Sequence, residues 1–475
     1  MLAESVSRGF FASSSIEFVG PEQGFSGDVW RAFSARTGAA ALPYSGNISM
    51  TERDLKRIFS ADSVKFFFLS KNADRNVSLA FFAMDAAKRL NVDIAKFTMY
   101  VAPNWEDIES FLQRRKREIS ANFDIKLVNF SRLAAHTLSR KYKPVDFIEF
   151  DKETALAKSD FNVAVVGLTP NSREALFKVY QQGRFEGSAF RLSVFDVASD
   201  ARYALLSRKY PGFLKDVSAS FKAINSYASA GDAILPKLEN FELVIVDLGS
   251  DSASAALTKL LQEKLSNSGN SRTTIAPFME NPSEFFAESP EHFPNVAHFG
   301  SVSEVYTCDA IIDDSFRSGG KFVNAYYNSS KSDPMKMKNW LAMSEFEKGS
   351  NVSVADFNST FIKLIGRENF ARIKNSEDFK AYLRGRPKLY ANLSRIEHLR
   401  WCAYLYSSGW DVLPLNGEIL AENKDAERKL HACLVPFDEL GKISEAFNED
   451  YKKYDSDNVD IIFDIYKTLH SEKNR

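Results

Sequence analysis

Cysteine is scarce in this chain, and so is any excess of charge. Three cysteines in 475 residues, Cys308, Cys402 and Cys433, are too few for a disulfide framework and are typical of a reduced, cytoplasmic protein. The 61 basic and 62 acidic side chains leave a net charge of −1, which argues against a protein that binds nucleic acid by neutralising phosphates. No apolar run approaches the roughly 20 residues that cross a bilayer, so we expect no membrane segment.

What the chain does have is an alternation of short β-rich runs and amphipathic helical stretches. Runs such as 97–101, 145–150 and 162–166 are separated by helical patterns, which is typical of βαβ units and a parallel sheet. The alternation restarts near 152–158 and gives way to helical, aromatic sequence beyond about 313. The sequence therefore predicts an α/β plus α fold, with two tandem Rossmann-like domains and then a mainly helical domain. The expected boundaries are 1–152, 153–315 and 316–475.

A glycine-rich loop follows the first predicted strand. Gly20, Gly24 and Gly27 precede a helical pattern, where glycines let backbone N–H groups approach a pyrophosphate at a helix N-terminus. The spacing is one residue longer than the usual dinucleotide fingerprint. No acidic residue ends a second strand about twenty residues later, where a ribose hydroxyl is usually bound.

The second Rossmann-like repeat has the complementary half of such a site. Asp196 ends a strand at the position of a ribose anchor, and the first loop of the repeat offers Gly167 and Thr169. We therefore predict these residues and the three glycines above as candidates for binding a nucleotide such as NAD or an ADP-ribose-like molecule. The alternative is that both loops merely turn the chain. Because neither fingerprint is complete, a hydride-transferring dehydrogenase is disfavoured.

The second repeat also carries a family resemblance. Gly231-Asp232-Ala233, then Leu235 and Leu238 and the strand 243–247, resemble the middle of TrkA-N Rossmann domains of potassium-transport regulators. The resemblance implies the Rossmann fold and supports no particular ligand.

The C-terminal third contains a helix with an unusual second face. Glu397, Arg400, Trp401 and Tyr404 follow the spacing i, i+3, i+4, i+7 and so share one side of a helix that Gly409 ends. The face combines an acid, a base and two aromatic rings, whereas an ordinary solvated face needs no aromatic rings.

This region resembles the RyR domain, the helical repeat module named after ryanodine receptors, over roughly 322–469. The matching positions are Glu397, His398, Arg400, Trp401, Gly409, Trp410, Lys429, His431, Leu434, Pro436, Leu440, Asp455 and Val459. The resemblance implies a recognition module that senses a nucleotide-derived signal, often in antiviral or conflict systems.

The residues themselves are compatible with such a module. Trp401, Tyr404 and Trp410 offer faces on which a base stacks. Three basic side chains offer hydrogen-bond donors to a phosphate, namely Arg400, Lys429 and His431. Glu397 is placed to orient Arg400 or to bind a ribose hydroxyl. The alternative is that the tryptophans are core residues and that Glu397 and Arg400 form a structural ion pair.

Other chemistries are less well supported. His398 and Cys402 are four residues apart and precede His431 and Cys433, a set that allows a Zn²⁺ site or a Cys–His nucleophile. Asp247 and Asp251, and likewise the pair at 313–314, allow a Mg²⁺ site, but acids after strands are more often helix caps.

Three functions remain open after the sequence analysis. The first is a cytoplasmic sensor or adaptor that binds a small nucleotide-like ligand through the RyR-like domain. The second is a non-catalytic structural protein that dimerises through its Rossmann-like domains. The third is an enzyme that acts on a nucleotide in a Rossmann cleft. We expect a homo-oligomer, with any effector output either supplied by a separate protein or hidden in residues interpreted here as structural.

Overall fold

The structure, a computed structural model, divides the chain into two compact units. It describes the residues 17–21, 40–44, 52–60, 64–69, 72–92, 97–102, 124–286, 293–312, 315–329, 339–415 and 422–472. The first unit comprises Met1–Leu133 and Ser303–Ser315, and the second comprises Ala134–Val302 and Phe316–Arg475. The second Rossmann-like domain and the helical region share one unit in this division, and the three predicted domain boundaries stay a prediction.

The first unit contains parallel strands and helices. Its elements are β1 (Glu17–Pro21), β2 (Ala40–Tyr44), α3 (Glu52–Phe59), β3 (Val64–Phe68), α4 (Ala73–Arg89), β4 (Phe97–Val101), β5 (Asp124–Leu127) and the start of α6 (Phe130–Lys141). β1 pairs with β2, and β3, β4 and β5 form a second parallel group.

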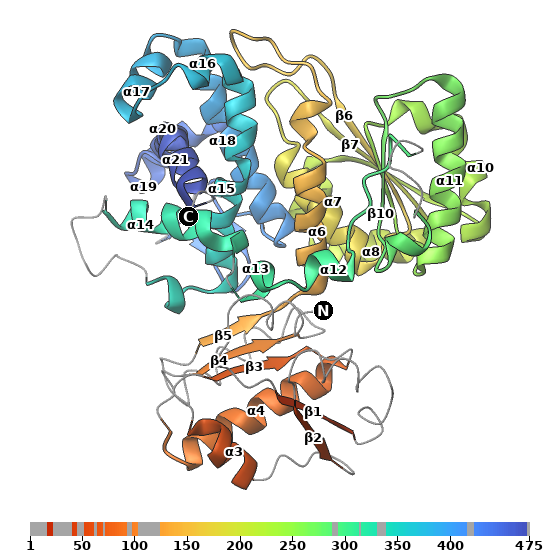
Figure 1. Cartoon of the computed structure of the whole chain (residues 1–475). Helices are drawn as coiled ribbons and strands as arrows, with labels where there is room; N and C mark the ends of the chain where they lie inside the picture. The colour runs from red at the N-terminus through yellow and green to blue at the C-terminus, as the bar shows by residue number, and fades with distance from the viewer. Residues whose placement is uncertain are drawn as a thin grey trace. The chain divides into compact units, whose positions relative to one another are not determined.

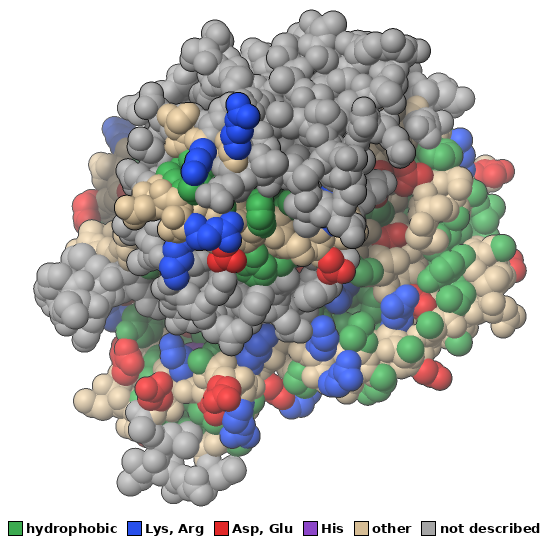
Figure 2. Space-filling view, turned by 90° about the horizontal axis from the view of Figure 1, so that it is seen from below, with side chains coloured by type: hydrophobic (Ala, Val, Ile, Leu, Met, Phe, Trp, Pro, Cys, Tyr) green, Lys and Arg blue, Asp and Glu red, His purple; other side chains and the backbone are tan. Residues whose placement is uncertain are grey.

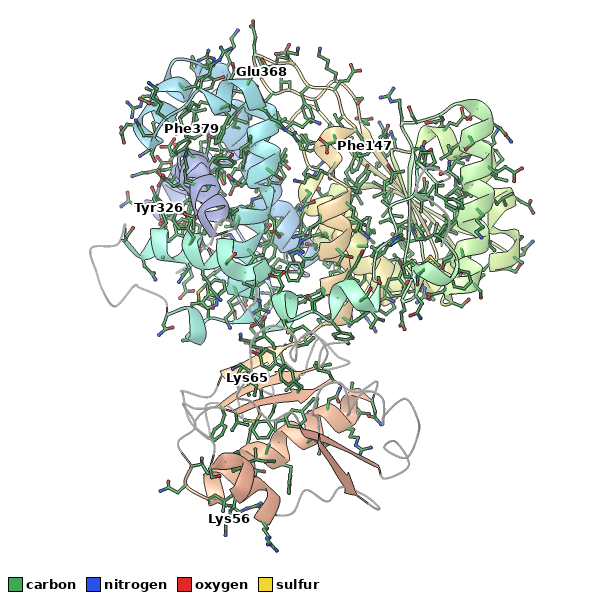
Figure 3. The ribbon with its side chains drawn as sticks, in the orientation of Figure 1. Lys56, Lys65, Phe147, Tyr326, Glu368 and Phe379 are labelled. Carbon is green, nitrogen blue, oxygen red and sulfur yellow. The ribbon has the colours of Figure 1, made fainter. Side chains whose placement is uncertain are left out.

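Side chains in β3 alternate between the two faces of its sheet. Phe66 and Phe68 pack into a core with the small residues of α4, whereas Lys65 is exposed, as is Lys56 of α3 (Figure 3). This alternation is the period of two expected for a strand with one buried face.

The second unit is built on a five-stranded parallel sheet. Its elements up to the sheet's last strand are β6 (Phe161–Val166), α7 (Pro170–Gln182), β7 (Phe190–Asp196), α8 (Ser199–Lys209), α9 (Pro211–Asp216), β8 (Ser218–Ala223), α10 (Ala230–Ile234), β9 (Leu243–Val246), α11 (Asp251–Ser268) and β10 (Thr274–Pro277). The spatial order is β10-β9-β6-β7-β8. Read from β8 to β10, this is the order 3-2-1-4-5 of doubly wound dinucleotide-binding folds.

A short segment extends this sheet beyond β10. Val296 and Phe299 make parallel bridges to Ile275 and Phe278, which is the place of the sixth strand in the same order. The predicted Rossmann-like fold is therefore confirmed by the topology.

Helices cover both faces of the sheet in the second unit. α7 lies on one face and α10 and α11 lie on the other (Figure 1). The core on the second face joins Ala164 and Val166 of β6 to Ile234, Leu257 and Leu261. β6 is buried along nearly its whole length, as expected for the central strand of a parallel sheet.

The helices α12 (Val302–Val305) and α13 (Cys308–Ile311) belong to the first unit, apart from Val302. The helical region follows them in the chain and completes the second unit. Its elements are α14 (Ser318–Ser329), α15 (Glu345–Ile365), α16 (Arg367–Ala371), α17 (Ser376–Arg384), α18 (Pro387–Ser407), β11 (Asp411–Val412), β12 (Lys424–Asp425), β13 (Leu430–His431), α19 (Leu440–Phe447), α20 (Tyr451–Asp460) and α21 (Ile462–Glu472). Phe379 of α17 is fully buried here (Figure 3). The predicted helical third is confirmed.

Two local predictions differ from the structure. The run at 145–150 is not a strand, because Pro144 begins a short 3-10 helix that ends at Asp146. Conversely, β8 was not predicted, since its sequence, Ser-Ala-Ser-Phe-Lys-Ala, has few residues of high β-propensity. β8 is an edge strand, and many of its side chains are exposed.

Charges of both signs are mixed on the molecular surface. Figure 2 shows basic and acidic side chains interspersed among the coloured residues of one face. This agrees with the net charge of −1 and gives no sign of a phosphate-binding surface among the described residues there.

Candidate functional site

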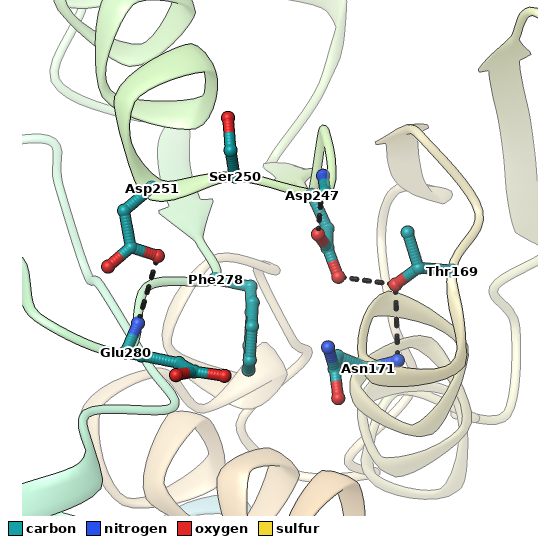
Figure 4. Close-up of a pocket in the computed structure, with 8 residues that line it drawn as sticks. Thr169, Asn171, Asp247, Ser250, Asp251, Phe278 and Glu280 are labelled. Carbon is teal, nitrogen blue, oxygen red and sulfur yellow. Dashed lines mark hydrogen bonds between the residues drawn. The ribbon is translucent and has the colours of Figure 1, made fainter. Parts of the chain in front are cut away.

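The second unit has a pocket at the carboxyl edge of its parallel sheet. β6 lies between β7 and β9, and the chain proceeds from β6 to β7 on one side and from β9 to β10 on the other. Ligands of doubly wound folds bind in the crevice that opens at such a reversal of strand order. The pocket has a volume of about 380 Å³, and it is lined by Thr169, Asn171, Asp247, Gly249, Ser250, Asp251, Phe278 and Glu280 (Figure 4).

The loop between β6 and α7 uses its backbone donors internally. The Gly167 N–H donates to the carbonyl of Phe195 at 2.9 Å, and the Leu168 N–H donates to Asp196 at 2.7 Å. The Thr169 N–H donates to the hydroxyl of Ser172, which in turn donates to the Gly167 carbonyl.

The first turn of α7 is capped in the same way. Thr169 is the N-cap, and its hydroxyl oxygen accepts from the N–H groups of Asn171 and Ser172, while Pro170 has no N–H. Five N–H groups that a pyrophosphate would need are therefore already bonded. This corrects the prediction that Gly167 and Thr169 cradle a phosphate in this structure.

Gly167 is required here for packing against the neighbouring strand. Its φ is +81°, and a Cβ atom would lie 2.0 Å from the carbonyl oxygen of Asp247. A side chain at this position would collide with backbone. The glycine thus brings the β6–α7 loop against the end of β9.

Asp196, the predicted ribose anchor, is fully buried, and its carboxylate is already bonded within the protein. Its carboxylate accepts from the N–H groups of Leu168 and Ala198, both at 2.7 Å, and it pairs with Arg202 at 3.3 Å. The prediction for Asp196 is corrected, because the carboxylate links the end of β7 to the β6–α7 loop. Its exposed area is zero, so it presents no oxygen to a ribose.

Asp247 is the acidic side chain at the centre of the pocket wall. It follows β9, is 2% exposed, and accepts hydrogen bonds from the Thr169 hydroxyl, from the Asn171 side chain and from the Gly249 N–H, the last at 3.2 Å. Burial holds the pKa of Asp247 above its usual range, and nearby Asp251 adds to this, although the hydrogen bonds act in the opposite direction. From the sequence alone, Asp247 is predicted only as a helix cap or a magnesium ligand. Its position directly after a buried strand was the available signal.

Asp251 holds two segments of the pocket together. Its carboxylate oxygens accept from the N–H groups of Glu280 and Asn281 at 3.0 and 2.8 Å, and so tie the start of α11 to the chain after β10 (Figure 4). Phe278 lies between Asp251 and Asp247 and supplies the apolar part of the lining.

The glycines predicted in the first unit make no site in the described structure. Gly20 lies within β1 and pairs with Pro43 of β2, so it belongs to the strand rather than to a loop after it. Gly24 and Gly27 lie outside the described residues.

In the helical region, Glu397 and Arg400 form a buried ion pair. Arg400 is 1% exposed and Glu397 is 0% exposed, and two hydrogen bonds of 2.7 Å join them. The remaining guanidinium nitrogen donates to Ser353 of α15, and Asn458 of α20 donates to Glu397. This corrects the prediction that the two residues bind a ligand, since the pair joins α18 to α15 and α20 within the core.

The predicted stacking rings pack against other aromatic side chains of the helical region. Phe346 of α15 stacks on both Tyr404 and Trp410, with ring centroids 5.5 and 5.4 Å apart, and Trp401 meets His431 edge-on at 5.1 Å. Tyr404 and Trp410 are buried, and the Tyr404 hydroxyl donates to the carbonyl of Phe346. These two rings are core residues, which corrects their predicted ligand role.

The other predicted ligand residues of the helical region are nearer the surface. Trp401 and His431 are half-buried, and burial lowers the pKa of His431 to about 4. Lys429 is exposed and donates to the carbonyl of Ser408 at 3.2 Å. Their predicted role in binding a ligand stays a prediction.

His398 forms a second buried pair in the helical region. Its Nδ1 lies 3.1 Å from the carboxylate of Asp455, and its Nε2 lies 2.8 Å from the carbonyl of Val435 and 3.4 Å from the Cys402 sulfur. Burial alone would lower the pKa of His398, but Cys402 and Asp455 hold it well above its usual value. Among the described residues no three His, Cys, Asp or Glu side chains are grouped as metal ligands, so the zinc alternative gains no support.

None of the described helices is both long and apolar enough to cross a membrane.

Comparisons with known proteins identify no family for this chain. No family model matches it. No curated protein matches it.

Solved structures match only weakly. A component of dipicolinate synthase from Bacillus halodurans matches at 12% identity and a TM-score of 0.24, covering 63% of this chain and 87% of its own. Salmonella D-lactate dehydrogenase matches at 13% identity and a TM-score of 0.23, covering 64% of this chain and 94% of its own. An NAD-complexed D-isomer specific 2-hydroxyacid dehydrogenase from Lactobacillus delbrueckii ssp. bulgaricus matches at 9% identity and a TM-score of 0.23. The match covers 63% of this chain and 95% of that protein. TM-scores this low carry no argument, so the fold assignment rests on the strand order.

Proposed function

We propose that this protein is a sensor or adaptor that holds a small polar molecule in the pocket beside Asp247 and transmits its occupancy to the helical region through α7. The observation that carries the proposal is the course of α7, which begins in the pocket and packs against α15 and α18 (Figure 1).

The pocket end of α7 is fixed by one side chain. The Thr169 hydroxyl caps the helix and donates to Asp247, so the cap and the pocket wall share a single hydrogen-bond network. A ligand that engages Asp247 competes with this network or tightens it, and either change acts on the first turn of α7.

The other end of α7 is fixed to the helical region by polar contacts. Lys178 Nζ lies 2.5 Å from Asp356 of α15, and the Gln181 side chain donates to Ser407 of α18 at 2.9 Å. Although burial opposes it, Lys178 holds the pKa of Asp356 below its usual range. The pair is partly buried, with 10% of the Lys178 and 26% of the Asp356 side chain exposed, and it helps to fix the relative position of two elements because breaking it leaves a charge uncompensated.

A ligand shifts a conformational equilibrium only by the difference in its affinity for the two states. α7 supplies the physical link that such a difference needs, since both ends are tied to separate parts of the unit. The sensor role agrees with the sequence prediction, but the proposed pocket lies in the second Rossmann-like domain rather than in the RyR-like region. The RyR resemblance, an antiviral role, a nucleotide-derived signal, homo-oligomerisation and a separate effector stay predictions.

Hydrogen exchange on the full chain tests the proposal. Agmatine, adenosine, AMP and NAD are first screened for a rise in Tm, and exchange is then measured with each probe that produces one. We expect slower exchange in the first turn of α7 and also in α15 and α18. In the double variant Lys178→Met with Gln181→Ala, exchange should still slow in the first turn of α7 but no longer in α15 and α18.

A substitution on the surface of the helical region is the control. Arg395→Ala removes the Arg395–Asp438 ion pair, which does not involve α7, and should leave both effects in place. Changes confined to the pocket loops of the unsubstituted protein would overturn the proposed transmission.

A further inference from the structure

Four acidic residues are buried in the described part of the chain, and three of them have a cationic partner. The four are Asp196, Asp247, Glu397 and Asp455, each less than 10% exposed. Asp196 pairs with Arg202, Glu397 with Arg400 and Asp455 with His398, at 3.3, 2.7 and 3.1 Å.

Asp247 is the exception. Its carboxylate has hydroxyl and amide donors but no basic side chain within ion-pair distance among the described residues. Ionised carboxylates are costly to bury without a compensating charge, and hydrogen bonds from neutral groups offset only part of that cost. The same carboxylate lines a cavity, so the missing charge has room to enter from outside the protein.

The surroundings of Asp247 add negative charge. The eight described residues that line the pocket include two further acids, Asp251 and Glu280, and among these eight there is no Lys, Arg or His. The N-terminus of α7 contributes a partial positive charge, but that is not a full counter-charge. An anionic ligand would enter a field of its own sign, whereas a cation is attracted into the pocket.

We propose that the pocket binds a small organic cation, an amine or a guanidine, whose N–H groups donate to Asp247 and Glu280 while its carbon chain packs on Phe278. The inference rests on the proposed function for the location of the ligand. It departs from the predicted nucleotide, because the phosphate-binding donors of the β6–α7 loop are used internally.

An organic cation fits the pocket better than a metal ion. The volume of about 380 Å³ lies near the lower end of small-molecule sites and far exceeds the space of one ion. Both oxygens of Asp251 accept backbone N–H groups, which removes that carboxylate as a ready metal ligand.

Calorimetric titration of the full chain with a charge series tests the inference. The probes are 1,4-diaminobutane, 4-amino-1-butanol and 1,4-butanediol, which share a length and carry two, one and no positive charges, together with agmatine, adenosine, AMP and Mg²⁺. We expect affinity to rise with positive charge, and agmatine to bind at least tenfold more tightly than AMP. Asp247→Asn should weaken agmatine binding at least tenfold.

One substitution and one measurement control the experiment. Asp232→Asn removes an exposed acid of α10 outside the pocket lining and should leave agmatine binding unchanged. A thermal melt of Asp247→Asn shows that the variant is folded.

The outcomes separate the ligand class from the proposed function. If adenosine or AMP binds in a way that depends on Asp247 while the amines do not bind, the proposal of a cationic ligand is overturned. The pocket then remains the proposed binding site. Mg²⁺ binding alone, agmatine binding that survives Asp247→Asn, or no binding by any amine also overturns the cationic ligand. Agmatine binding without a change of exchange in α15 and α18 supports the cation and refutes the transmission.

Discussion

Asp247 in the Rossmann-like domain and Glu397 in the helical region are both buried acids, but they are neutralised differently. Glu397 shares two hydrogen bonds with Arg400, and Ser353 and Asn458 complete the cluster. Asp247 has Thr169 and Gly249 as donors and a cavity beside it.

The difference separates a structural site from a candidate binding site. A core that contains a charge must contain its partner, because no other molecule can reach it. A pocket can leave the partner to a ligand, and its unliganded state then retains an electrostatic cost that binding relieves. Charge-bearing residues with aromatic neighbours, as in α18, are therefore a weaker sign of a site than one buried charge facing open space.

The largest effect is expected when the internal pair is broken. Arg400→Met leaves the Glu397 carboxylate buried without its cation and should cost about 3–5 kcal/mol in the free energy of unfolding. Urea denaturation measures this loss. The double variant Glu397→Leu with Arg400→Met removes both charges and should recover much of it. A single variant as stable as the unsubstituted protein would show that the pair is not part of the core.

Two glycines give a matched pair in the pocket region. Gly167 and Gly249 have φ angles of +81° and +79°. A Cβ at Gly167 would collide with the Asp247 carbonyl, whereas a Cβ at Gly249 would have no described atom within 4 Å apart from its chain neighbours. Gly249→Ala should cost about 1 kcal/mol for the backbone conformation alone. Gly167→Ala should cost more, roughly 2–4 kcal/mol, because the loop must move away from β9.

Thermal denaturation of the two variants decides this prediction. Equal losses would mean that the close approach of the β6–α7 loop to β9 is not required for stability.

A third effect concerns pH and the His398–Asp455 pair. The raised pKa of His398 means that its contribution is fully present below the unfolded value of about 6.5 and is lost as pH rises through the higher folded value. The free energy of unfolding should therefore fall as pH rises above about 6.5, by on the order of 1 kcal/mol for this group. His398→Gln should flatten the fall. A profile unchanged by the substitution would show that the imidazole is neutral in the folded protein.

The sequence predicted the central strands well because they are continuous apolar runs. The run 162–166 is almost β6, and 243–246 is β9. β8 escaped prediction because an edge strand with exposed serines lacks that signal. Pro144 redirected the run at 145–150, since its ring favours the start of a helical turn.

The candidate site was harder to predict, because its decisive feature is a missing partner. Helical spacing placed Glu397 and Arg400 on one face, but the spacing of an ion pair is the same in a core and in a pocket. The role of Asp196 depended on Leu168 and Arg202, which only the folded loop brings to it. Asp247 has no cationic partner among the described residues. This absence depends on the folded positions of all its neighbours, so the sequence could not predict it.

The smallest effect concerns Asp247 itself. Because burial raises its pKa, its contribution to stability is present below the unfolded value of about 3.9 and is lost as pH rises through the folded value. The stability of Asp247→Asn relative to the unsubstituted protein should therefore improve as pH rises from about 3 to 6, by on the order of 1 kcal/mol or less. Asp438, whose pKa is lowered by its hydrogen bond from Arg395, should show the opposite trend in Asp438→Asn. Denaturation of both variants and the unsubstituted protein across this pH range measures the two trends. The same measurement is repeated with saturating agmatine. A bound cation should reduce the pH dependence at Asp247 and leave that at Asp438 unchanged.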